Sequence, residues 1–433
     1  MSLLSSAVTH TVSSPVPIPA EIAISGGPLL LASLSEGPSL AAHRARWGAL
    51  LPLGVDQLID EASALELRGR GGAGFPFAIK LRTAAESSGR AEVVINLSEG
   101  EPVSAKDTAL ALTRPHLVLD GAVAAATALR ARTVHVVVPS ERSATEQAIR
   151  AAVGERADPV AWRFHRAEPR FVAGQARAVI ELIEGRTNLP VTAWQPEAVS
   201  GIRGRPTLLS NAETWAHLGV LATRGVAAYD GRGTATEPGT VLLTLVDDRR
   251  STTGELLTQV IEVDYGTRWR DVLRPEWAGR PAIIGGFHGS WSTWDTLASA
   301  RVSPAAMRSL GIGLGAGAVW MQPLGACPVQ VTARTVAYLA DQSARRCGPC
   351  FNGLPALADS LHRVLAGTGG REEVDRLIAL VTGRGACAHP DGTARLVRSL
   401  LTTFPAEMRG HAHGDCPARG QMGSWANETR VLS

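Results

Sequence analysis

The fold class is decided by two aliphatic runs, Glu92-Val-Val-Ile-Asn96 and Thr133-Val-His-Val-Val-Val-Pro139. Each is short, rich in β-branched residues and apolar at consecutive positions, which is typical of strands buried on both faces. Ser140 is placed to cap a helix over residues 144–152. Such runs alternate with helical segments from residue 59 to about residue 236. This alternation predicts an α/β domain with a largely parallel sheet.

Two further units follow the α/β domain along the chain. The run Gly239-Thr-Val-Leu-Leu-Thr-Leu-Val246 predicts a strand, residues 269–273 a short helix, and Pro281-Ala-Ile-Ile-Gly-Gly286 another strand. Over residues 237–325 this pattern is typical of a small β-grasp-like domain. From residue 326 to the C-terminus, apolar residues at three- and four-residue spacing predict a helical bundle. Its helices are expected at residues 332–343, 354–365, 371–382 and 391–403, and the first 58 residues are expected to form a partly ordered arm.

Composition excludes several classes of function. The chain has 433 residues with a net charge of only +3, whereas nucleic-acid binders normally carry a basic excess, so no nucleic-acid partner is expected. The N-terminal stretch has no basic segment and no apolar run long enough for a signal or a membrane span, so we expect a cytoplasmic protein. Five cysteines are too few and too unevenly placed for a disulfide framework.

The most distinctive stretch is Arg68-Gly-Arg-Gly-Gly-Ala-Gly-Phe-Pro-Phe-Ala-Ile-Lys80. Glycines permit the positive φ angles that align successive N–H groups around an anion, and Arg70 and Lys80 add positive charge. The stretch matches neither a P-loop nor the G-x-G-x-x-G fingerprint. It predicts a phosphate or pyrophosphate site, with an ordinary flexible loop as the alternative.

Polar residues follow the first predicted strand directly. Asn96, Ser98, Glu99 and Glu101 stand at its carboxyl end, which is where open α/β sheets bind ligands. This position predicts a ligand site, with a solvated acidic turn as the alternative.

Three stretches together resemble the family of flavin subunits of respiratory complex I and of NAD-linked hydrogenases and formate dehydrogenases. Residues 68–80 and 96–107 resemble that family's FMN and NADH site. Gly204-Arg-Pro-Thr-Leu-Leu-Ser-Asn-Ala-Glu-Thr-Trp215 resembles its G-x-P-T-x-x-N-N-V-E-T segment. The resemblance implies a divergent member, with a Rossmann-like FMN-binding domain over residues 59–236, an SLBB-like β-grasp domain over 237–325 and a helical iron-sulfur domain over 326–433.

The resemblance also implies which residues surround the flavin. FMN needs an anion nest for its phosphate and polar groups for its ribityl chain and ring edges. No catalytic residue is assigned, because hydride or electron transfer is the chemistry of the cofactor itself. The implied flavin residues are Gly69, Arg70, Gly71, Gly72, Lys80, Asn96, Ser98, Gly174, Gln175, Asn211 and Thr214.

Departures from the family pattern concentrate around the nicotinamide nucleotide. The family's Y-x-C-G-E-E reads Phe171-Val-Ala-Gly-Gln-Ala176 here, so both glutamates are absent. Thr83 stands at a position that is usually aromatic, and the later P-P-F-P-A reads Gln195-Pro-Glu197, whereas Phe75 is kept. We therefore expect that FMN binding is retained and that NAD binding is weakened or lost.

The cysteines indicate a metal centre. Cys347-Gly-Pro-Cys350 opens a helix, and Cys387 follows in Gly385-Ala-Cys-Ala-His-Pro-Asp-Gly392. Two intervening residues let both thiolates face one metal, and a redox dithiol or a zinc half-site is the alternative. The family's S-C-G-x-C-x-P-C-R-x-G and C-A-L-G motifs imply that Cys347, Cys350 and Cys387 are three ligands of an iron-sulfur cluster. The first ligand position falls on Ala344.

Three thiolates can hold a 3Fe-4S cluster, or a 4Fe-4S cluster that takes a fourth ligand from elsewhere. The candidates for that ligand are His389, Cys416 and a partner subunit. Cys416 lies in His411-Ala-His-Gly-Asp-Cys-Pro417, which resembles the family's terminal H-x-x-x-x-C-P. Cys327 is expected to pack in the core or a loop.

Together these features predict an oxidoreductase subunit that carries FMN and an iron-sulfur cluster. Its donor would be NADH or a ferredoxin-like protein, and its partner a ferredoxin-like or membrane redox subunit in a hetero-oligomeric complex, which would attach it to a membrane only through partners. A non-catalytic scaffold or assembly subunit is the alternative from another class. A ligand-sensing module acting through the β-grasp segment is a third.

Overall fold

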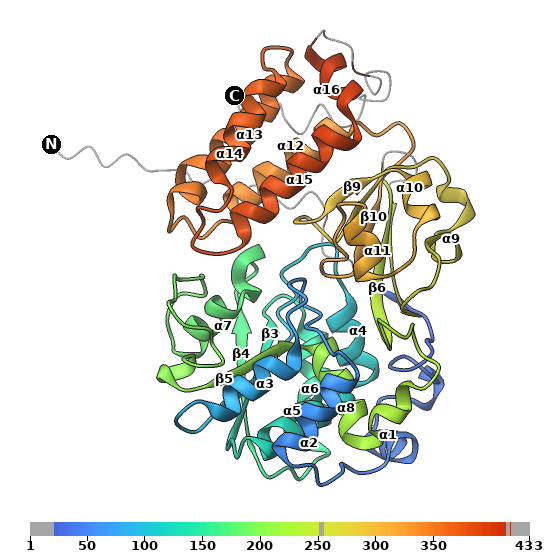
Figure 1. Cartoon of the computed structure of the whole chain (residues 1–433), viewed down its shortest axis with the longest axis vertical. Coiled ribbons are helices and arrows are strands. Elements are labelled where there is room, and N and C mark those ends of the chain that lie inside the picture. Colours follow the sequence, from blue (N-terminus) through green and yellow to red (C-terminus); the bar gives the residue numbers. More distant parts are fainter. Residues whose placement is uncertain (1–20, 251–254, 413–415, 417–433) are drawn as a thin grey trace, which may run out of the picture.

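Two sheets and a helical bundle organise the chain (Figure 1). The computed structural model describes residues 21–250, 255–412 and 416. In Figure 1 the bundle lies at one end of the molecule, and the two sheet-containing units lie side by side beneath it. Among the described helices, none has both the length and the apolar character that a membrane span requires.

The first unit is the expected α/β domain. Its sheet has the order β4-β3-β2-β5, with all strands parallel. The central strands are apolar and buried along almost their whole length, as expected for a sheet covered on both faces. The strands are β2 (Glu92–Asn96), β3 (Thr133–Pro139), β4 (Ala161–Ala167) and β5 (Thr207–Asn211). The helices are α2 (Val55–Ala64), α3 (Phe77–Glu86), α4 (Lys106–Thr113), α5 (Pro115–Ala128), α6 (Ser143–Gly154), α7 (Ala176–Ile183) and α8 (Ala212–Arg224), with 3-10 turns η2 (Phe171–Gly174), η3 (Ile202–Gly204) and η4 (Val226–Tyr229).

The strand order reverses at β2. The chain builds outward from β2 through β3 to β4 and then returns to place β5 on the other side of β2. In this register Asn96 at the end of β2 pairs with Asn211 at the end of β5. The carboxyl ends of these two strands therefore form the switch point at which open α/β sheets bind ligands.

The predicted helix cap at Ser140 is wrong. The amide of Ser140 donates to the carbonyl of Ala167 (3.1 Å), which extends the contact between β3 and β4. The helix α6 begins at Ser143 instead, with Arg142 as its N-cap residue. Ser140 therefore adds one more hydrogen bond between the ends of β3 and β4, and the chain turns only after it.

The second unit is a mixed six-stranded sheet of order β1-β7-β6-β10-β8-β9. Its hydrophobic core contains the fully buried Trp269 and Trp277. The strands are β1 (Ala23–Ile24), β6 (Thr240–Arg249), β7 (Glu255–Asp264), β8 (Ala282–Ile284), β9 (Ser290–Ser292) and β10 (Ala318–Met321). The helical segments are α9 (Trp269–Val272), η5 (Pro275–Trp277), α10 (Trp294–Ser299) and α11 (Pro304–Ser309).

The N-terminal segment, over its described part, is integrated into the fold. Strand β1 pairs with β7, and the helix α1 (Leu40–Trp47), preceded by the turn η1 (Leu34–Glu36), packs against α5 and α8. The carboxylate of Glu262 accepts the amides of Leu29, Leu30 and Leu31 at 2.8–3.0 Å. Residues 21–47 therefore brace both units, and residues 1–20 of the expected arm lie outside the described part.

The third unit is the expected helical bundle. It shares one hydrophobic core with the six-stranded sheet, because Trp291 and Trp320 pack in the same cluster as Val336 and Leu361. Its elements are α12 (Pro328–Asp341), the π-helical turn η6 (Pro349–Gly353), α13 (Leu354–Leu365), α14 (Arg371–Val381), α15 (His389–Thr403) and α16 (Pro405–Ala412). The turn η6 carries the Cys347-Gly-Pro-Cys350 segment into α13, as the sequence predicts.

Candidate functional site

The glycine loop stands at the switch point with its amides available. The amide of Gly69 donates to the carbonyl of Phe75 (2.8 Å), which closes the base of the loop, while Gly72 and Gly74 take positive φ angles of 101° and 65°. Within the described structure the backbone amides of residues 71–74 have no hydrogen-bond acceptor. Successive free amides on glycines are the donor set that a phosphate requires, so the loop fits the phosphate of FMN.

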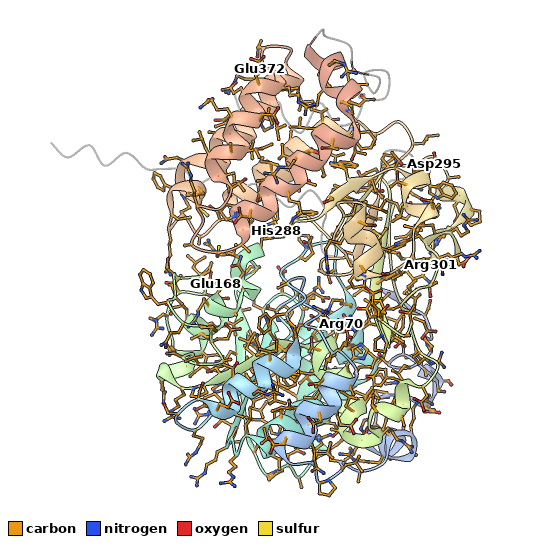
Figure 2. All side chains as sticks on the ribbon, in the orientation of Figure 1. Arg70, Glu168, His288, Asp295, Arg301 and Glu372 are labelled. Atoms are coloured by element: carbon orange, nitrogen blue, oxygen red, sulfur yellow. The ribbon has the colours of Figure 1, made fainter. Side chains whose placement is uncertain are left out.

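Arg70 holds this loop against the second unit. Its amide donates to Oγ1 of Thr214 (2.9 Å), and its guanidinium donates to the carbonyl of Thr240 (3.2 Å) and lies over the ring of Tyr265 (4.9 Å). Figure 2 shows Arg70 between the α/β unit and the six-stranded sheet. Burial lowers the pKa of Arg70, with Glu213 acting in the opposite direction. The side chain therefore positions the loop on the sheet behind it.

Lys80 has a partner that the sequence did not predict. Its Nζ donates to Oε1 of Glu197 (2.7 Å) and to the carbonyl of Leu209 (3.0 Å). Glu197 occupies the position where the family pattern has an aromatic residue. The resemblance implies that the positive charge of Lys80 faces the flavin phosphate. In this structure that charge is paired with the carboxylate of Glu197.

The remaining flavin candidates form two small hydrogen-bonded groups at the strand ends. Oδ1 of Asn211 accepts the amide of Thr214 (3.3 Å), which caps α8, and also the hydroxyl of Thr214 (2.6 Å). Nδ2 of Asn96 donates to the carbonyl of Gly174 (2.8 Å), and its Oδ1 accepts the hydroxyl of Ser98 (2.6 Å). The structure therefore brings the distant segments 69–74, 96–98, 174–175 and 211–214 to one edge of the sheet.

A buried charge cluster lies beneath these strand ends, and sequence analysis missed it. Nζ of Lys106 contacts Oδ1 of Asp107 (3.1 Å) and Oε2 of Glu213 (2.9 Å), and all three side chains are almost fully buried. Oε1 of Glu213 accepts the amide of Leu242 (2.9 Å) from the second unit. Burial raises the pKa of Asp107 to about 6, against the lowering effect of Lys106. The sequence did carry a signal for this cluster, because Lys106 lies in the stretch 96–107 and Glu213 in the stretch 204–215, and both stretches were expected near the flavin.

Glu101 joins the α/β unit to the six-stranded sheet. Its Oε2 accepts the amide of Phe287 (2.9 Å), while its buried Oε1 has no partner within the described structure. A Cβ added at Gly286 would lie 2.4 Å from this carboxyl, so the turn at Gly286 must remain free of a side chain. Burial raises the pKa of Glu101 to about 8.

This raised pKa predicts a pH-dependent loss of stability. The folded state keeps the Glu101 proton up to about pH 8, whereas the unfolded state releases it near pH 4.5, so stability falls as pH rises through this window. The E101Q variant lacks this loss. We therefore expect the free energy of unfolding of E101Q, relative to that of the wild type, to rise by on the order of 3 kcal/mol between pH 5 and pH 8. Urea titrations of both proteins at the two pH values measure this difference. Parallel changes in the two proteins would show that Glu101 ionises normally.

The three predicted cluster cysteines are neighbours near the start of the bundle, although their sulfur atoms do not all lie within 4.8 Å of one another in the described structure. Burial raises the pKa of Cys350 to about 12, and the nearby thiols of Cys347 and Cys387 raise it further. Burial likewise raises the pKa of Cys387, with a smaller contribution in the same direction from Cys347. Three neighbouring thiols are the type of donor that an iron-sulfur cluster takes, so the residues present fit such a cluster.

Gln175 connects this cysteine group to the flavin candidates. Burial raises the pKa of the Cys387 thiol, and the side chain of Gln175 beside that thiol acts in the opposite direction. The residue before it, Gly174, presents its carbonyl to Asn96 at the end of β2 (2.8 Å). A single dipeptide therefore touches both candidate cofactor sites.

His389 is unsuited to be the fourth cluster ligand in this structure. Its Nε2 lies 2.8 Å from the carbonyl of Leu339 and so must carry the proton, which leaves Nδ1 to accept Nε2–H of His288 (3.0 Å). Burial lowers the pKa of His389 to about 4, consistent with a neutral ring. Figure 2 shows His288 where the bundle meets the other units. Both ring nitrogens of His389 are thus already engaged, one by the carbonyl of Leu339 and the other by His288.

Cys416 also lies too far from the cluster cysteines to be their fourth ligand. Its sulfur lies within 4.8 Å of Sγ of Cys327, the N-cap residue of α12. Cys347 follows the other end of this 14-residue helix, and the two helix ends are about 20 Å apart. Of the three candidates for a fourth ligand, only one from outside the chain is left.

Comparisons with known proteins agree with this division of the chain. Residues 62–219 match the model of the Nuo51 FMN-binding domain, and residues 330–411 match that of the NADH-ubiquinone oxidoreductase-F iron-sulfur binding region. Two NADH-quinone oxidoreductase F subunits of Rhizobium meliloti are similar to this chain, and the one numbered 2 is 27% identical over 406 residues, covering 88% of this chain and 94% of that protein. The mitochondrial NADH dehydrogenase (ubiquinone) flavoprotein 1 of Dictyostelium discoideum is 27% identical over 396 residues, covering 83% and 79%.

A solved structure shows the same fold. The crystal structure of an NAD+-reducing NiFe-hydrogenase in the air-oxidized state superposes with a TM-score of 0.78 at 23% identity, covering 90% of this chain and 68% of that one. All eleven predicted flavin residues lie inside the first matched region, and the three predicted cluster cysteines lie inside the second. Cys327 and Cys416 lie outside both.

Proposed function

Because this chain belongs, as a divergent member, to the family of flavin subunits of respiratory complex I and NAD-linked hydrogenases, we propose that it passes electrons from a reduced donor to a partner redox subunit. Its cofactors are FMN and an iron-sulfur cluster. FMN exchanges electron pairs with organic donors and single electrons with iron-sulfur clusters. The protein supplies the positions of both groups and the exclusion of water between them.

The observation that carries this proposal is the link through residues 174 and 175. Asn96 holds the carbonyl of Gly174 at the strand end where the flavin would lie, and the side chain of Gln175 lies beside the thiol of Cys387. A rigid protein connection of this kind keeps two redox groups at a fixed separation. The largely apolar and buried strands β2 and β3 exclude water from the sheet side of the site.

The proposal gives several of the predicted cofactor residues a definite task. The amides of residues 71–74 would bind the phosphate, and Arg70 keeps their loop against the sheet. Asn96 and Asn211 would offer side-chain amide groups to the ribityl chain or the ring edge. The cluster residues Cys347, Cys350 and Cys387 would hold a 3Fe-4S cluster, or a 4Fe-4S cluster with a fourth ligand from outside the chain.

The proposal is tested by anaerobic reduction of the purified protein. Dithionite added stepwise should bleach the flavin absorbance and change the EPR spectrum of the cluster in the same titration, since a 4Fe-4S cluster gains a signal on reduction and a 3Fe-4S cluster loses the signal of its oxidised form. If a ferredoxin-like acceptor then reoxidises the flavin and the cluster together, both groups take part in electron transfer. A flavin that titrates alone, with no cluster signal at any stage, would overturn the electron-transfer assignment.

We propose further that NADH is a poor donor for this chain. Two acceptors for sugar hydroxyls are missing, because Gln175 and Ala176 replace the family's glutamates, and Gln175 is already engaged by Cys387. Glu197, paired with Lys80, occupies a position that the family uses for an aromatic contact. A ferredoxin-like donor would need none of these groups.

Stopped-flow mixing with NADH checks this expectation. At micromolar NADH we expect flavin bleaching to be at least about 100-fold slower than typical turnover of a few tens per second. Dithionite on the same sample is the control that shows the flavin is accessible and reducible. Rapid bleaching by NADH would contradict the loss of the nicotinamide site.

The same proposed function suggests a type of partner and a cellular location. We propose a hetero-oligomeric complex in the cytoplasm, with any membrane attachment made through a partner subunit. Cys347 is half-buried and the neighbouring Phe351 is 55% exposed, which leaves an apolar contact beside the cluster for that partner. The partner would be a ferredoxin-like or membrane redox subunit that accepts single electrons.

Two observations favour a second candidate, a non-catalytic assembly subunit. Lys80 is neutralised by Glu197, and Ala344 stands where the family has its first cluster cysteine. Both departures weaken cofactor binding without disturbing the fold. This candidate requires a protein that holds neither flavin nor iron, even after reconstitution.

A further inference from the structure

Three metal-ligating side chains converge at the end of α12 remote from the cluster cysteines. Cys327 is the N-cap residue of α12, His411 lies in the last turn of α16, and Cys416 follows that helix. One ligand atom of each lies within 4.8 Å of the others, and Sγ of Cys327 is 3.0 Å from Nε2 of His411. Cys327 and His411 are buried, and Cys416 is half-buried.

The donor set and its size suit a single zinc ion. Tetrahedral zinc bonds sulfur at about 2.3 Å and imidazole nitrogen at about 2.0 Å, so its ligand atoms stand roughly 3.5–3.8 Å apart. The 3.0 Å between Cys327 and His411 is about 0.5 Å shorter than this spacing, and none of the three ligand atoms is more than 4.8 Å from another, so modest side-chain shifts would let them share one ion. Two thiolates and an imidazole are borderline-soft ligands that favour zinc over magnesium or calcium. We propose that Cys327, His411 and Cys416 bind a zinc ion that is separate from the iron-sulfur cluster.

Glu407 is the candidate for a fourth ligand, and its carboxylate would have to move closer, because it lies outside the group whose ligand atoms are within 4.8 Å of one another. It precedes His411 by four residues on α16, so both side chains project from the same face of the helix. Its Oε2 is buried and has no hydrogen-bond partner within the described structure. Glu407 and Cys327 line one cavity of about 210 Å³ between the bundle and the six-stranded sheet. A buried carboxylate oxygen without a partner is costly, and a metal ion in this space would satisfy it.

The ion would act as a structural clip. It joins the start of α12 to α16 and to Cys416, and the cavity beside it is also lined by Pro281 and Thr293 of the six-stranded unit. Closed four-ligand sites of this kind contribute directly to folding stability. The clip would fix the C-terminal end of the bundle at its seam with the sheet.

The test compares metal content in four proteins purified under the same conditions. Zinc and iron are counted by plasma mass spectrometry in the wild type, C327S, C416S and C387S. We expect one zinc per wild-type chain, loss of zinc but not iron in C327S and C416S, and loss of iron but not zinc in C387S. Zinc affinity, measured by competition with a chromophoric chelator, should fall by more than about 100-fold in C416S, because even an outer partner contributes 10–100-fold.

Other outcomes would overturn the proposal. One is a wild-type protein that stays free of zinc after incubation with zinc and dialysis. Retention of zinc in C327S would place the ion elsewhere, and a Cys327–Cys416 disulfide in peptide mapping without reductant would explain the pair without metal. An unchanged zinc affinity in E407Q would remove Glu407 as the fourth ligand. Cobalt substitution gives an independent readout, since thiolate-to-cobalt absorption should appear in the wild type and vanish in C416S.

Discussion

Replacing Cys350 by serine should abolish iron binding. Cys350 is 2% exposed, and burial raises the pKa of its thiol, with a further raising effect from the nearby thiols of Cys347 and Cys387. With three protein thiolates available, loss of one leaves two, which cannot hold a cluster in place. We expect the iron content to fall from the three or four atoms of one cluster to nearly zero. The brown absorbance and the EPR signal should disappear with it.

A matched control separates this effect from misfolding. The C327S variant removes an equally buried thiol from the other end of α12. It should keep its iron and its flavin spectrum. Iron that stays at the wild-type level in C350S would show that the cysteine group is not the cluster site.

The second large effect is expected for Lys106→Met. Nζ of Lys106 neutralises the buried carboxylates of Asp107 and Glu213, so its removal leaves Asp107 without a counter-charge and Glu213 with only Arg70 at 4.0 Å. Breaking a buried ion pair from one side costs about 3–5 kcal/mol. Urea titration of the wild type and K106M at pH 8 measures this loss.

The pH dependence of the loss identifies its cause. Burial raises the pKa of Asp107 to about 6 even with Lys106 present, so at pH 5 Asp107 takes up a proton and the loss in K106M should shrink. Lys80→Met is the matched control, because Lys80 pairs with Glu197 at a partly exposed site and should cost about 1 kcal/mol or less. A loss in K106M that is equal at both pH values would contradict the electrostatic explanation.

The sequence predicted the elements that depend on local patterns. Residues 92–96 and 133–139 were expected as strands and form β2 and β3, because unbroken aliphatic runs have few alternatives to a buried sheet. The helix over residues 354–365 was likewise predicted with its observed ends. The switch point was inferable from the polar residues that follow β2, since parallel strands gather such residues at one edge.

The sequence could not predict features that depend on contacts between distant residues. Glu262 anchors Leu30 across 232 positions, so the N-terminal segment looks like an arm until the sheet exists. Lys80 meets Glu197 across 117 positions, and this pairing changes the environment proposed for the phosphate. His389 and Cys416 looked equally available as cluster ligands, and only the packing of α15 and α16 shows that neither is.

The most direct test of the account is a cofactor count on the anaerobically purified protein. Acid-released flavin, iron and acid-labile sulfide are measured in one sample together with its visible spectrum. The account predicts one FMN per chain with about three or four irons and a similar amount of sulfide. A colourless protein that takes up neither flavin nor iron on reconstitution would contradict it and would leave the assembly role as the function of this chain.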